Sequence, residues 1–293
     1  MTMSSAFRRR GAVRRLIVGL AFMLSGGAAG AETLIAATGY TTQYDVYPAA
    51  GPVALIFLHG KNGTQTTPLM REFGERIAQA GHTVYLPLMP WSRKWDGTVA
   101  DANAVIDALV AIAAKDGRRV VVGGQSLGAT FAITWRPDDA PGAVVGKLFT
   151  NPGGMLDMLP PTGNFWKAIG PALEQARALE AAGKGREKAI FVGTNVKGTQ
   201  TIEERYETTA EIFLSFHDTG RFPSVRSALA RTRGPVFWST GKLDPVPTSK
   251  RRTFEMITAN PASLYLEPDG DHNSSMLTAI EAILGWLAAR AAD

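Results

Sequence analysis

The sequence predicts an α/β protein in which a mostly parallel sheet is flanked by helices. Short apolar runs bounded by glycine and proline alternate with longer stretches of helical periodicity, which is the pattern of strands joined by crossover helices. The apolar runs are continuous, as is typical of strands buried on both faces of a parallel sheet. The chain has 293 residues, 45% of them hydrophobic and 19% charged, which favours one large globular domain.

Six apolar runs are predicted to be the strands of this sheet, at residues 53–58, 83–88, 120–124, 144–150, 235–238 and 263–266. Helical periodicity predicts helices between and after them, at residues 67–80, 99–114, 249–258 and 275–289. Two segments near the start, 33–37 and 44–47, predict an antiparallel beginning of the sheet.

One interval is too long for a simple crossover. About eighty residues separate the strand that ends near Thr150 from the one that starts at Pro235, whereas a βαβ unit takes roughly 30 residues. We therefore predict a helical insertion before the penultimate strand, at about residues 152–233, and call this segment the cap. Helices are expected in it at residues 165–182 and 202–215, with an isolated apolar run at 189–192.

The charge of the chain is concentrated at its N-terminus. The formal net charge is +5, and five of the 31 basic residues lie in residues 1–31, which contain no acidic residue, so the remaining 26 balance the 26 acidic ones. Beyond residue 31 no net charge attracts a phosphate backbone, and no basic run is interleaved with aromatic residues. Nucleic acid is therefore not expected as a partner.

Residues 1–31 have the layout of a cleavable secretory signal. Five arginines precede the nine apolar residues 16–24, and a tail of small residues ends at Ala31, before Glu32. Nine apolar residues fall far short of the roughly 20 that span a bilayer. We predict cleavage after Ala31, a mature domain at residues 32–293 without a stable membrane anchor, and a periplasmic or secreted location. The export route and the oligomeric state stay open.

The sequence contains no cysteine. Disulfides, thiolate zinc sites, iron–sulfur clusters and cysteine nucleophiles are therefore excluded. Any covalent chemistry must use oxygen or nitrogen atoms.

A candidate nucleophile follows the third strong strand, in the pentapeptide Gly124–Gly128, which has the pattern G-x-S-x-G. A strand that enters a helix through so tight a turn strains the central residue, here Ser126, and needs glycine on either side because side chains would collide. The serine hydroxyl is then exposed at the carboxyl edge of the sheet. The backbone N–H of Leu127, at the start of the helix, points to where an oxyanion would form.

This strand-turn-helix motif resembles the nucleophile motif of the α/β-hydrolase superfamily, and the resemblance covers essentially all of residues 33–293. It implies the fold of that superfamily, similar to secreted serine esterases and lipases. It also implies a second oxyanion donor in the loop after an earlier strand, often marked by a His-Gly pair. Because His59 and Gly60 stand in the matching place, the N–H of Lys61 is the implied partner of Leu127, with Asn62 as the alternative.

A serine hydroxyl needs a nearby imidazole to take its proton, and the imidazole needs a carboxylate. Of the four histidines, His272 is the best base by position, because it follows the last strand, in a loop at the carboxyl edge. The order of the family, serine, then acid, then histidine, implies Asp244 as the acid, after the preceding strand. Asp269 and Asp271 are closer to His272 in sequence, but both fit turn positions.

Such a triad with two N–H donors transfers an acyl group to water through an acyl-enzyme. Carboxylic esters of small molecules are the predicted substrates, because an alkoxide leaves more easily than an amide nitrogen. A thioesterase and an amidase or peptidase are alternatives, as is a non-catalytic binding protein that kept the fold. The chemistry requires no metal or cofactor.

Substrate contacts are expected from loops at the same edge of the sheet. Trp91 and Trp95 follow the strand at 83–88, and Gln125 lies beside the predicted nucleophile. These three residues are the candidates for substrate binding, although Gln125 could instead hold the turn. Four aromatic residues of the cap either line the pocket or pack the cap onto the body, namely Phe165, Trp166, Phe213 and Phe216.

Overall fold

The structure is a computed structural model that describes residues 30–136 and 142–292. The predicted signal therefore lies outside the described residues, except for Gly30 and Ala31, which begin the first strand. Cleavage after Ala31 would shorten that strand by two residues. Among the described residues, no helix is long and apolar enough to cross a membrane.

The central sheet has eight strands in the order β1-β2-β4-β3-β5-β6-β9-β10. β1 and β2 pair antiparallel at one edge and β2 pairs antiparallel with β4, whereas all other neighbours are parallel. The fold class predicted from the sequence is confirmed. The strands are β1 (Gly30–Ile35), β2 (Thr41–Tyr47), β3 (Val53–Leu58), β4 (Thr83–Pro87), β5 (Arg119–Gln125), β6 (Val144–Thr150), β9 (Val236–Ser239) and β10 (Leu264–Leu266).

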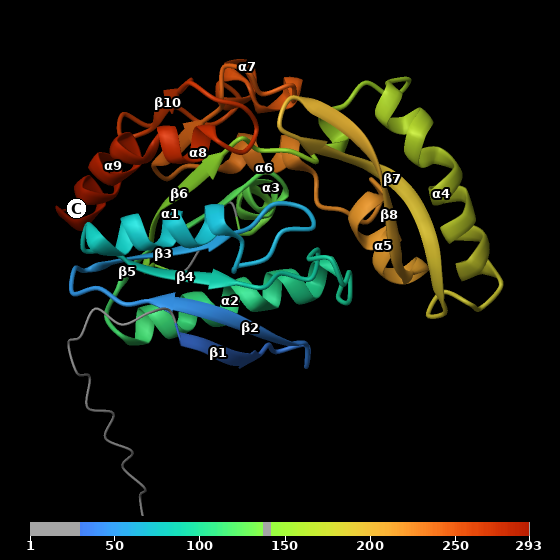
Figure 1. Ribbon diagram of the computed structural model, residues 1–293, viewed down its shortest axis with the longest axis horizontal. Helices are drawn as coiled ribbons and strands as arrows, with labels where there is room; N and C mark the ends of the chain where they lie inside the picture. The colour runs from blue at the N-terminus through green and yellow to red at the C-terminus, as the bar shows by residue number, and fades with distance from the viewer. Residues whose placement is uncertain (1–29, 137–141, 293) are drawn as a thin grey trace, which may run out of the picture.

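Helices cover both faces of the sheet, which is why its central parallel strands are largely apolar. β3 is buried at every residue. Its alternate side chains Val53, Leu55 and Phe57 pack in the cluster with α1 (Pro68–Gln79), α8 (Ser275–Thr278) and α9 (Ile280–Ala292). The intervening side chains of β3 pack in the larger cluster with α2 (Val99–Lys115) and α3 (Leu127–Thr134). Figure 1 shows α1 and α9 on one side of the sheet and α2 on the other.

Two predicted helices differ from the observed ones. The segment 249–258 forms only the short helix α7 (Arg251–Phe254), after the 3-10 turn η2 (Pro247–Ser249). The carbonyl of Ser249 cannot start a helix, because it accepts hydrogen bonds from the indole of Trp238 and the hydroxyl of Thr240. The segment predicted at 275–289 is divided into α8 and α9 at Ala279.

The cap contains helices, as expected, and also an antiparallel hairpin, whose first strand includes the isolated apolar run at 189–192. Its elements are η1 (Leu156–Met158), α4 (Asn164–Ala181), β7 (Lys188–Lys197), β8 (Gln200–Thr209), α5 (Ala210–His217) and α6 (Val225–Arg231). In Figure 1, α4, α5 and the hairpin form a lobe beside the carboxyl edge of the parallel strands.

The first part of the predicted cap helix at 202–215 is strand β8. Its glutamates and arginine are good helix formers, but Tyr206 and Thr208 turn inward while Arg205 and Glu207 stay exposed. This alternation matches a strand with one buried face. Pairing with β7 in continuous register, from Lys188 with Thr209 to the hairpin turn, overrides the local preference.

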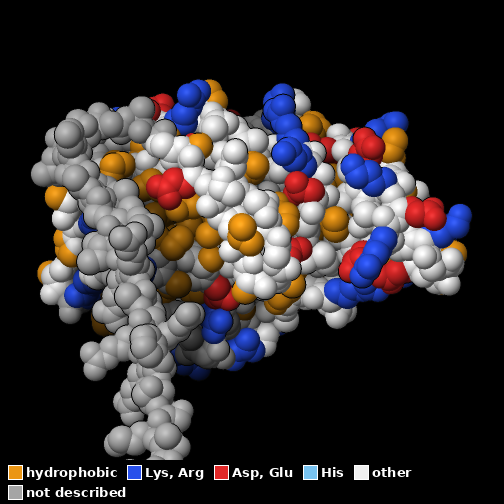
Figure 2. Space-filling model, turned by 90° about the horizontal axis from the view of Figure 1, so that it is seen from below, with side chains coloured by type: hydrophobic (Ala, Val, Ile, Leu, Met, Phe, Trp, Pro, Cys, Tyr) orange, Lys and Arg blue, Asp and Glu red, His pale blue; other side chains and the backbone are white. Residues whose placement is uncertain are grey.

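The surface of the described residues carries charges of both signs. On the face seen in Figure 2, basic and acidic side chains lie interspersed on the part of the molecule away from the grey segment. Within the cap, basic and acidic side chains form ion pairs, such as Arg221 with Glu180 and Arg177 with Asp218. Neither sign gathers into an extended field on this face of the described chain.

Candidate active site

The turn between β5 and α3 presents Ser126 at the carboxyl edge of the sheet. Ser126 has a φ of 56° and a ψ of −120°, a conformation that costs energy for a residue with a side chain. The flanking glycines explain how the turn closes. A Cβ on Gly124 would lie 2.5 Å from the carbonyl carbon of Gly128, and one on Gly128 would lie 2.2 Å from the carbonyl oxygen of Leu58.

Substitution Gly128→Ala is expected to destabilise the protein, because its methyl group would meet backbone that cannot move aside. We expect the free energy of unfolding to fall by about 3 kcal/mol, as overpacking in a closed site does. Gly285→Ala is the matched control, since nothing lies within 4 Å of the added methyl group in α9 and alanine stabilises a helix by about 1 kcal/mol over glycine. Urea unfolding measures both, and equal stability of the two variants would contradict this account.

A continuous hydrogen-bonded chain leads from Ser126 to a buried carboxylate. Nε2 of His272 lies 2.8 Å from Oγ of Ser126, and Nδ1 of His272 lies 3.0 Å from Oδ2 of Asp244. His272 comes from the loop after β10, and Asp244 from the loop after β9. Both side chains are almost fully buried, so bulk water does not compete for these bonds.

The carboxylate of Asp244 is held by its own loop. Its Oδ1 accepts the backbone N–H of Val246 at 2.9 Å, which leaves Oδ2 for the imidazole. The two other aspartates near His272 are engaged elsewhere. Asp269 pairs with Lys242 at the surface, and Asp271 caps its own turn, where backbone N–H groups of Ser274 and Asn273 hold the pKa of the Asp271 carboxyl below its usual value.

The two predicted oxyanion donors flank the nucleophile. Leu127 is the first residue of α3. The opposing loop lies against Ser126, because a Cβ on Gly60 would be only 3.1 Å from the Cβ of Ser126. Within the described residues, no protein acceptor takes the backbone N–H of Lys61 or of Leu127, whereas Asn62 donates its N–H to the carbonyl of Trp91 at 3.0 Å. The geometry therefore favours Lys61 over the alternative, Asn62.

Two side chains, those of His59 and Trp91, fix the loop that carries Lys61. His59 accepts the N–H of Met89 on Nε2 at 2.9 Å and contacts the carbonyl of Gly60 through Nδ1 at 2.8 Å. Because an acceptor Nε2 carries no proton, Nδ1 is the donor and the ring is neutral. Burial lowers the pKa of His59 to about 4, in keeping with a structural role. The indole of Trp91 donates to the carbonyl of His59 at 2.9 Å.

Two of the expected substrate contacts are placed elsewhere by the structure. Trp91 is fully buried and stacks on Phe131 at 4.2 Å between ring centroids, so it packs the core beneath the loop and does not line the pocket. Gln125 is also buried, and its amide donates to the carbonyl of His272 at 3.0 Å. It therefore holds the histidine loop to the turn, which is the other role considered for it.

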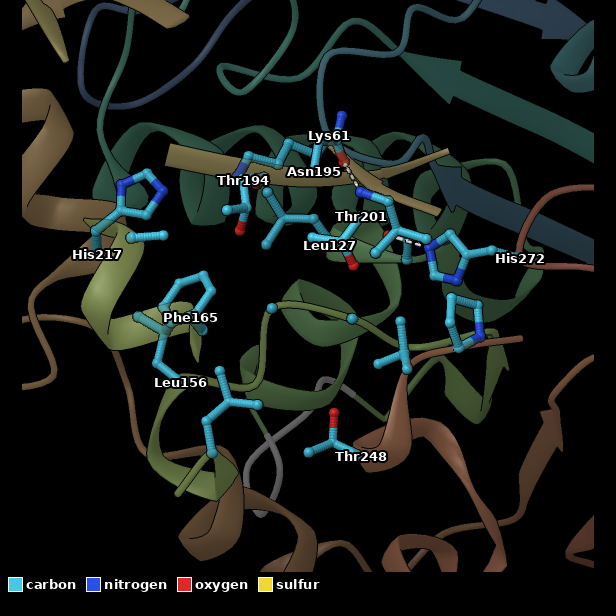
Figure 3. A pocket seen from close by; sticks show the side chains of 18 of the residues that line it. Lys61, Leu127, Leu156, Phe165, Thr194, Asn195, Thr201, His217, Thr248 and His272 are labelled. Carbon is cyan, nitrogen blue, oxygen red and sulfur yellow. Dashed lines mark hydrogen bonds between the residues drawn. The ribbon is translucent and has the colours of Figure 1, made fainter. Parts of the chain in front are cut away.

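A pocket of about 460 Å³ opens between the sheet edge and the cap, with Ser126 and His272 in its wall. Of the expected residues, Trp95, Phe165 and Phe216 line it. Phe213 instead stacks on Phe191 within the cap. In Figure 3, His272 and His217 lie at opposite ends of the view, with Leu156 and Phe165 along one wall. The remaining lining is mostly apolar, with Leu127, Leu159, Val196, Pro245 and Val246 among its members.

Asn151 connects two segments of the site through hydrogen bonds, a role that the sequence did not predict. Asn151 follows β6 with a φ of 47° and is fully buried. Its Oδ1 accepts the N–H of Gly241 at 2.7 Å, and its Nδ2 donates to Oγ of Ser275 at 2.7 Å. It thereby joins the loop of the acid to the helix that follows the histidine. Asn at the end of a strand is an ordinary turn signal, so the sequence alone offers no sign of this role.

No metal centre is evident in the described part of the chain. Within residues 30–136 and 142–292, no three His, Asp or Glu side chains converge as they would around a metal ion.

The fold and this site together define a hydrolase of the α/β class. Residues 55–285 match the alpha/beta hydrolase family, so the chain belongs to that family, as its resemblance implied. No protein of curated function matches the sequence.

Solved structures show the same fold at low sequence identity. The structure of DcsB in complex with its substrate analogue has a TM-score of 0.69 at 14% identity and covers 90% of this chain and 100% of its own. The alpha/beta hydrolase GrgF from Penicillium sp. sh18 has a TM-score of 0.68 at 16% identity over 91% of this chain and 100% of its own. A monoacylglycerol lipase from Paleococcus ferrophilus has a TM-score of 0.62 at 17% identity and covers 85% of this chain and 99% of its own.

Proposed function

We propose that this protein is a serine hydrolase that cleaves carboxylic esters of small molecules. The observation that carries the proposal is the chain of contacts from Asp244 through His272 to Ser126, at 3.0 and 2.8 Å, which opens into a largely apolar pocket. Nucleophile, base and orienting acid in hydrogen-bond reach of one another are the signature of activated-serine chemistry.

In the proposed reaction, Oγ of Ser126 attacks the ester carbonyl while Nε2 of His272 takes its proton. Asp244 keeps the other proton on Nδ1 and stabilises the imidazolium. The carbonyl oxygen becomes an oxyanion that accepts the N–H groups of Leu127 and Lys61. His272 then gives its proton to the leaving alkoxide, and the C–O bond breaks to leave an acyl-enzyme. Water, deprotonated by His272, attacks this ester, and the acid and Ser126 are released.

The ester preference rests on the pocket and on a structural neighbour. An apolar wall beside the nucleophile suits an acyl or alkyl chain, and one protein of the same fold is a monoacylglycerol lipase. Thioesters and amides would pass through the same intermediates. A binding protein that kept the fold would retain the pocket but not the reactivity of Ser126.

Titration with a fluorophosphonate, followed by a substrate panel, tests the proposal. We expect stoichiometric labelling that peptide mapping assigns to Ser126, and faster turnover of an ester than of the thioester and amide of the same acyl group. A preference for the thioester or amide would shift the substrate class. No label on Ser126 together with no turnover of any panel member would support the binding protein instead.

A further inference from the structure

The side chain of Lys61 leaves the oxyanion loop and crosses into the cap. Its Nζ donates to the backbone carbonyl of Thr194 on β7 at 2.7 Å. The same ammonium lies 4.8 Å from the ring centroid of Tyr206 and 5.9 Å from that of Trp95. Lys61, Thr194 and Trp95 all line the pocket that contains Ser126, so the cation belongs to the same cavity as the nucleophile.

The ammonium of Lys61 has more N–H donors than hydrogen-bond acceptors among the described residues. A lysine carries three N–H groups, and within the described residues Nζ of Lys61 makes one hydrogen bond. Lys61 is partly buried, and withdrawing a cation from water is costly unless it is paired. The two aromatic rings offset part of that cost, but two N–H groups remain without an acceptor from the described chain. They lie in a pocket whose other lining is mostly apolar.

The neighbouring titratable groups do not neutralise Lys61. His217, from α5, is kept neutral because burial lowers its pKa to about 3, aided by the charge of Lys61, and its Nδ1 contacts the carbonyl of Phe213. Burial raises the pKa of Tyr206 well above its usual value. Glu204 on β8 favours the charged form of Lys61, yet no carboxylate oxygen of the described residues lies within 4 Å of Nζ.

Lys61 itself is mainly cationic at neutral pH. Burial lowers the pKa of its ammonium to about 8, so the protonated form predominates at pH 7. The group loses its charge as the pH rises through 8 to 9, well within the range in which a hydrolase can be assayed.

We propose that the pocket selects esters that carry a carboxylate, with the reacting ester at Ser126 and the carboxylate on the ammonium of Lys61. This inference rests on the proposed function of the same site. A partly buried ammonium with two N–H groups to spare can donate charge-assisted hydrogen bonds to a carboxylate. The apolar wall between the two ends of the pocket suits the methylene chain that would join the ester to the acid. The expected substrates are therefore half-esters of dicarboxylic acids, or esters of hydroxy acids.

Two matched series of substrates test this inference. Monomethyl adipate, suberate and sebacate carry the carboxylate on the acyl side, with methyl hexanoate, octanoate and decanoate as neutral partners. O-acetyl derivatives of ω-hydroxy acids carry it on the alcohol side, with alkyl acetates as neutral partners. At pH 7 we expect kcat/KM for the anionic member to exceed that of its neutral partner by at least about tenfold in one series, as one charge-assisted hydrogen bond allows.

The variant Lys61→Met keeps the length of the side chain and removes its charge. The ratio of anionic to neutral kcat/KM should fall to about one or below. Lys188→Met is the matched control, because Lys188 is exposed at the start of β7, and it should keep the wild-type ratio. A pH series on the wild type needs no variant. The ratio should decline above pH 8, and ionisation of His272 cancels from it because both substrates depend on the same base.

Several outcomes would overturn the inference. Equal kcat/KM for anionic and neutral esters in both series would do so, as would a preference that survives in Lys61→Met. Calorimetry on Ser126→Ala separates this inference from the proposed function. Tighter binding of a half-ester than of its neutral partner supports the carboxylate site even if no ester is turned over, and equal binding rejects the site even if neutral esters are good substrates.

Discussion

Ser126→Ala is expected to lower kcat for ester hydrolysis about 10⁶-fold, the loss typical of removing the nucleophile from a serine triad. Among the described residues, the hydroxyl of Ser126 is the one side-chain group hydrogen-bonded to Nε2 of His272, so we expect no other group to take over its role. His272→Ala should cause a loss of similar size. The double variant should be no worse than either single one, because the two residues act as a unit. Initial rates with a short-chain p-nitrophenyl ester measure all three.

Ser227→Ala is the matched control for this prediction. Ser227 is exposed on α6, away from the pocket, so its variant should retain wild-type kcat. Ser126→Ala should also fail to react with a fluorophosphonate while keeping its thermal unfolding transition. Substantial activity in a folded Ser126→Ala protein would reject the mechanism.

Asp244→Asn is expected to lower kcat about 10⁴-fold with little change in KM, because it reverses the tautomer of the histidine. The N–H of Val246 needs an acceptor on the near side of the Asp244 side chain, so the amide oxygen of the variant stays there. The amide nitrogen then faces Nδ1 of His272 and donates to it. The proton moves to Nε2, and the imidazole can no longer accept the proton of Ser126.

Asp269→Asn provides the control. Asp269 lies close to His272 in sequence, but its side chain is exposed and paired with Lys242. Its variant should keep kcat within about twofold, as expected for a surface pair. If Asp269→Asn were the inactive variant and Asp244→Asn the active one, the acid would be misassigned.

The parallel sheet could be predicted because each of its strands has a local signal. β3 is a continuous apolar run, β5 and β6 are largely apolar, and every run predicted as a strand of the sheet is one. The cap was harder because its signals conflict. Residues 202–209 are rich in helix formers, yet they form β8 because β7 is available to pair with them. Pairing with the neighbouring strand of the hairpin outweighs a preference worth tenths of a kcal/mol per residue.

The candidate site was partly predictable for a similar reason. The turn at Ser126 depends on neighbouring glycines, so the sequence around Ser126 is enough to predict its geometry. His272 and Asp244 could be named from chain order, and the structure brings both side chains to Ser126. Their catalytic roles, like the secretory signal at residues 1–31, stay predictions. Trp91 was assigned to the pocket because it follows a strand end, but position along the chain does not say which way a side chain points.

The sequence by itself determined the class of the fold, the strained turn at Ser126 and the order of the candidate triad, because strand burial, glycine sterics and chain order can be read along the chain. Only the tertiary structure decided which donors and acceptors meet. Asn151 joins two loops about 90 and 124 residues farther along the chain, and the ammonium of Lys61 reaches a carbonyl 133 residues away, on β7 of the cap. Such contacts depend on how distant elements pack, and packing is what places an ordinary lysine in the wall of the pocket beside Ser126.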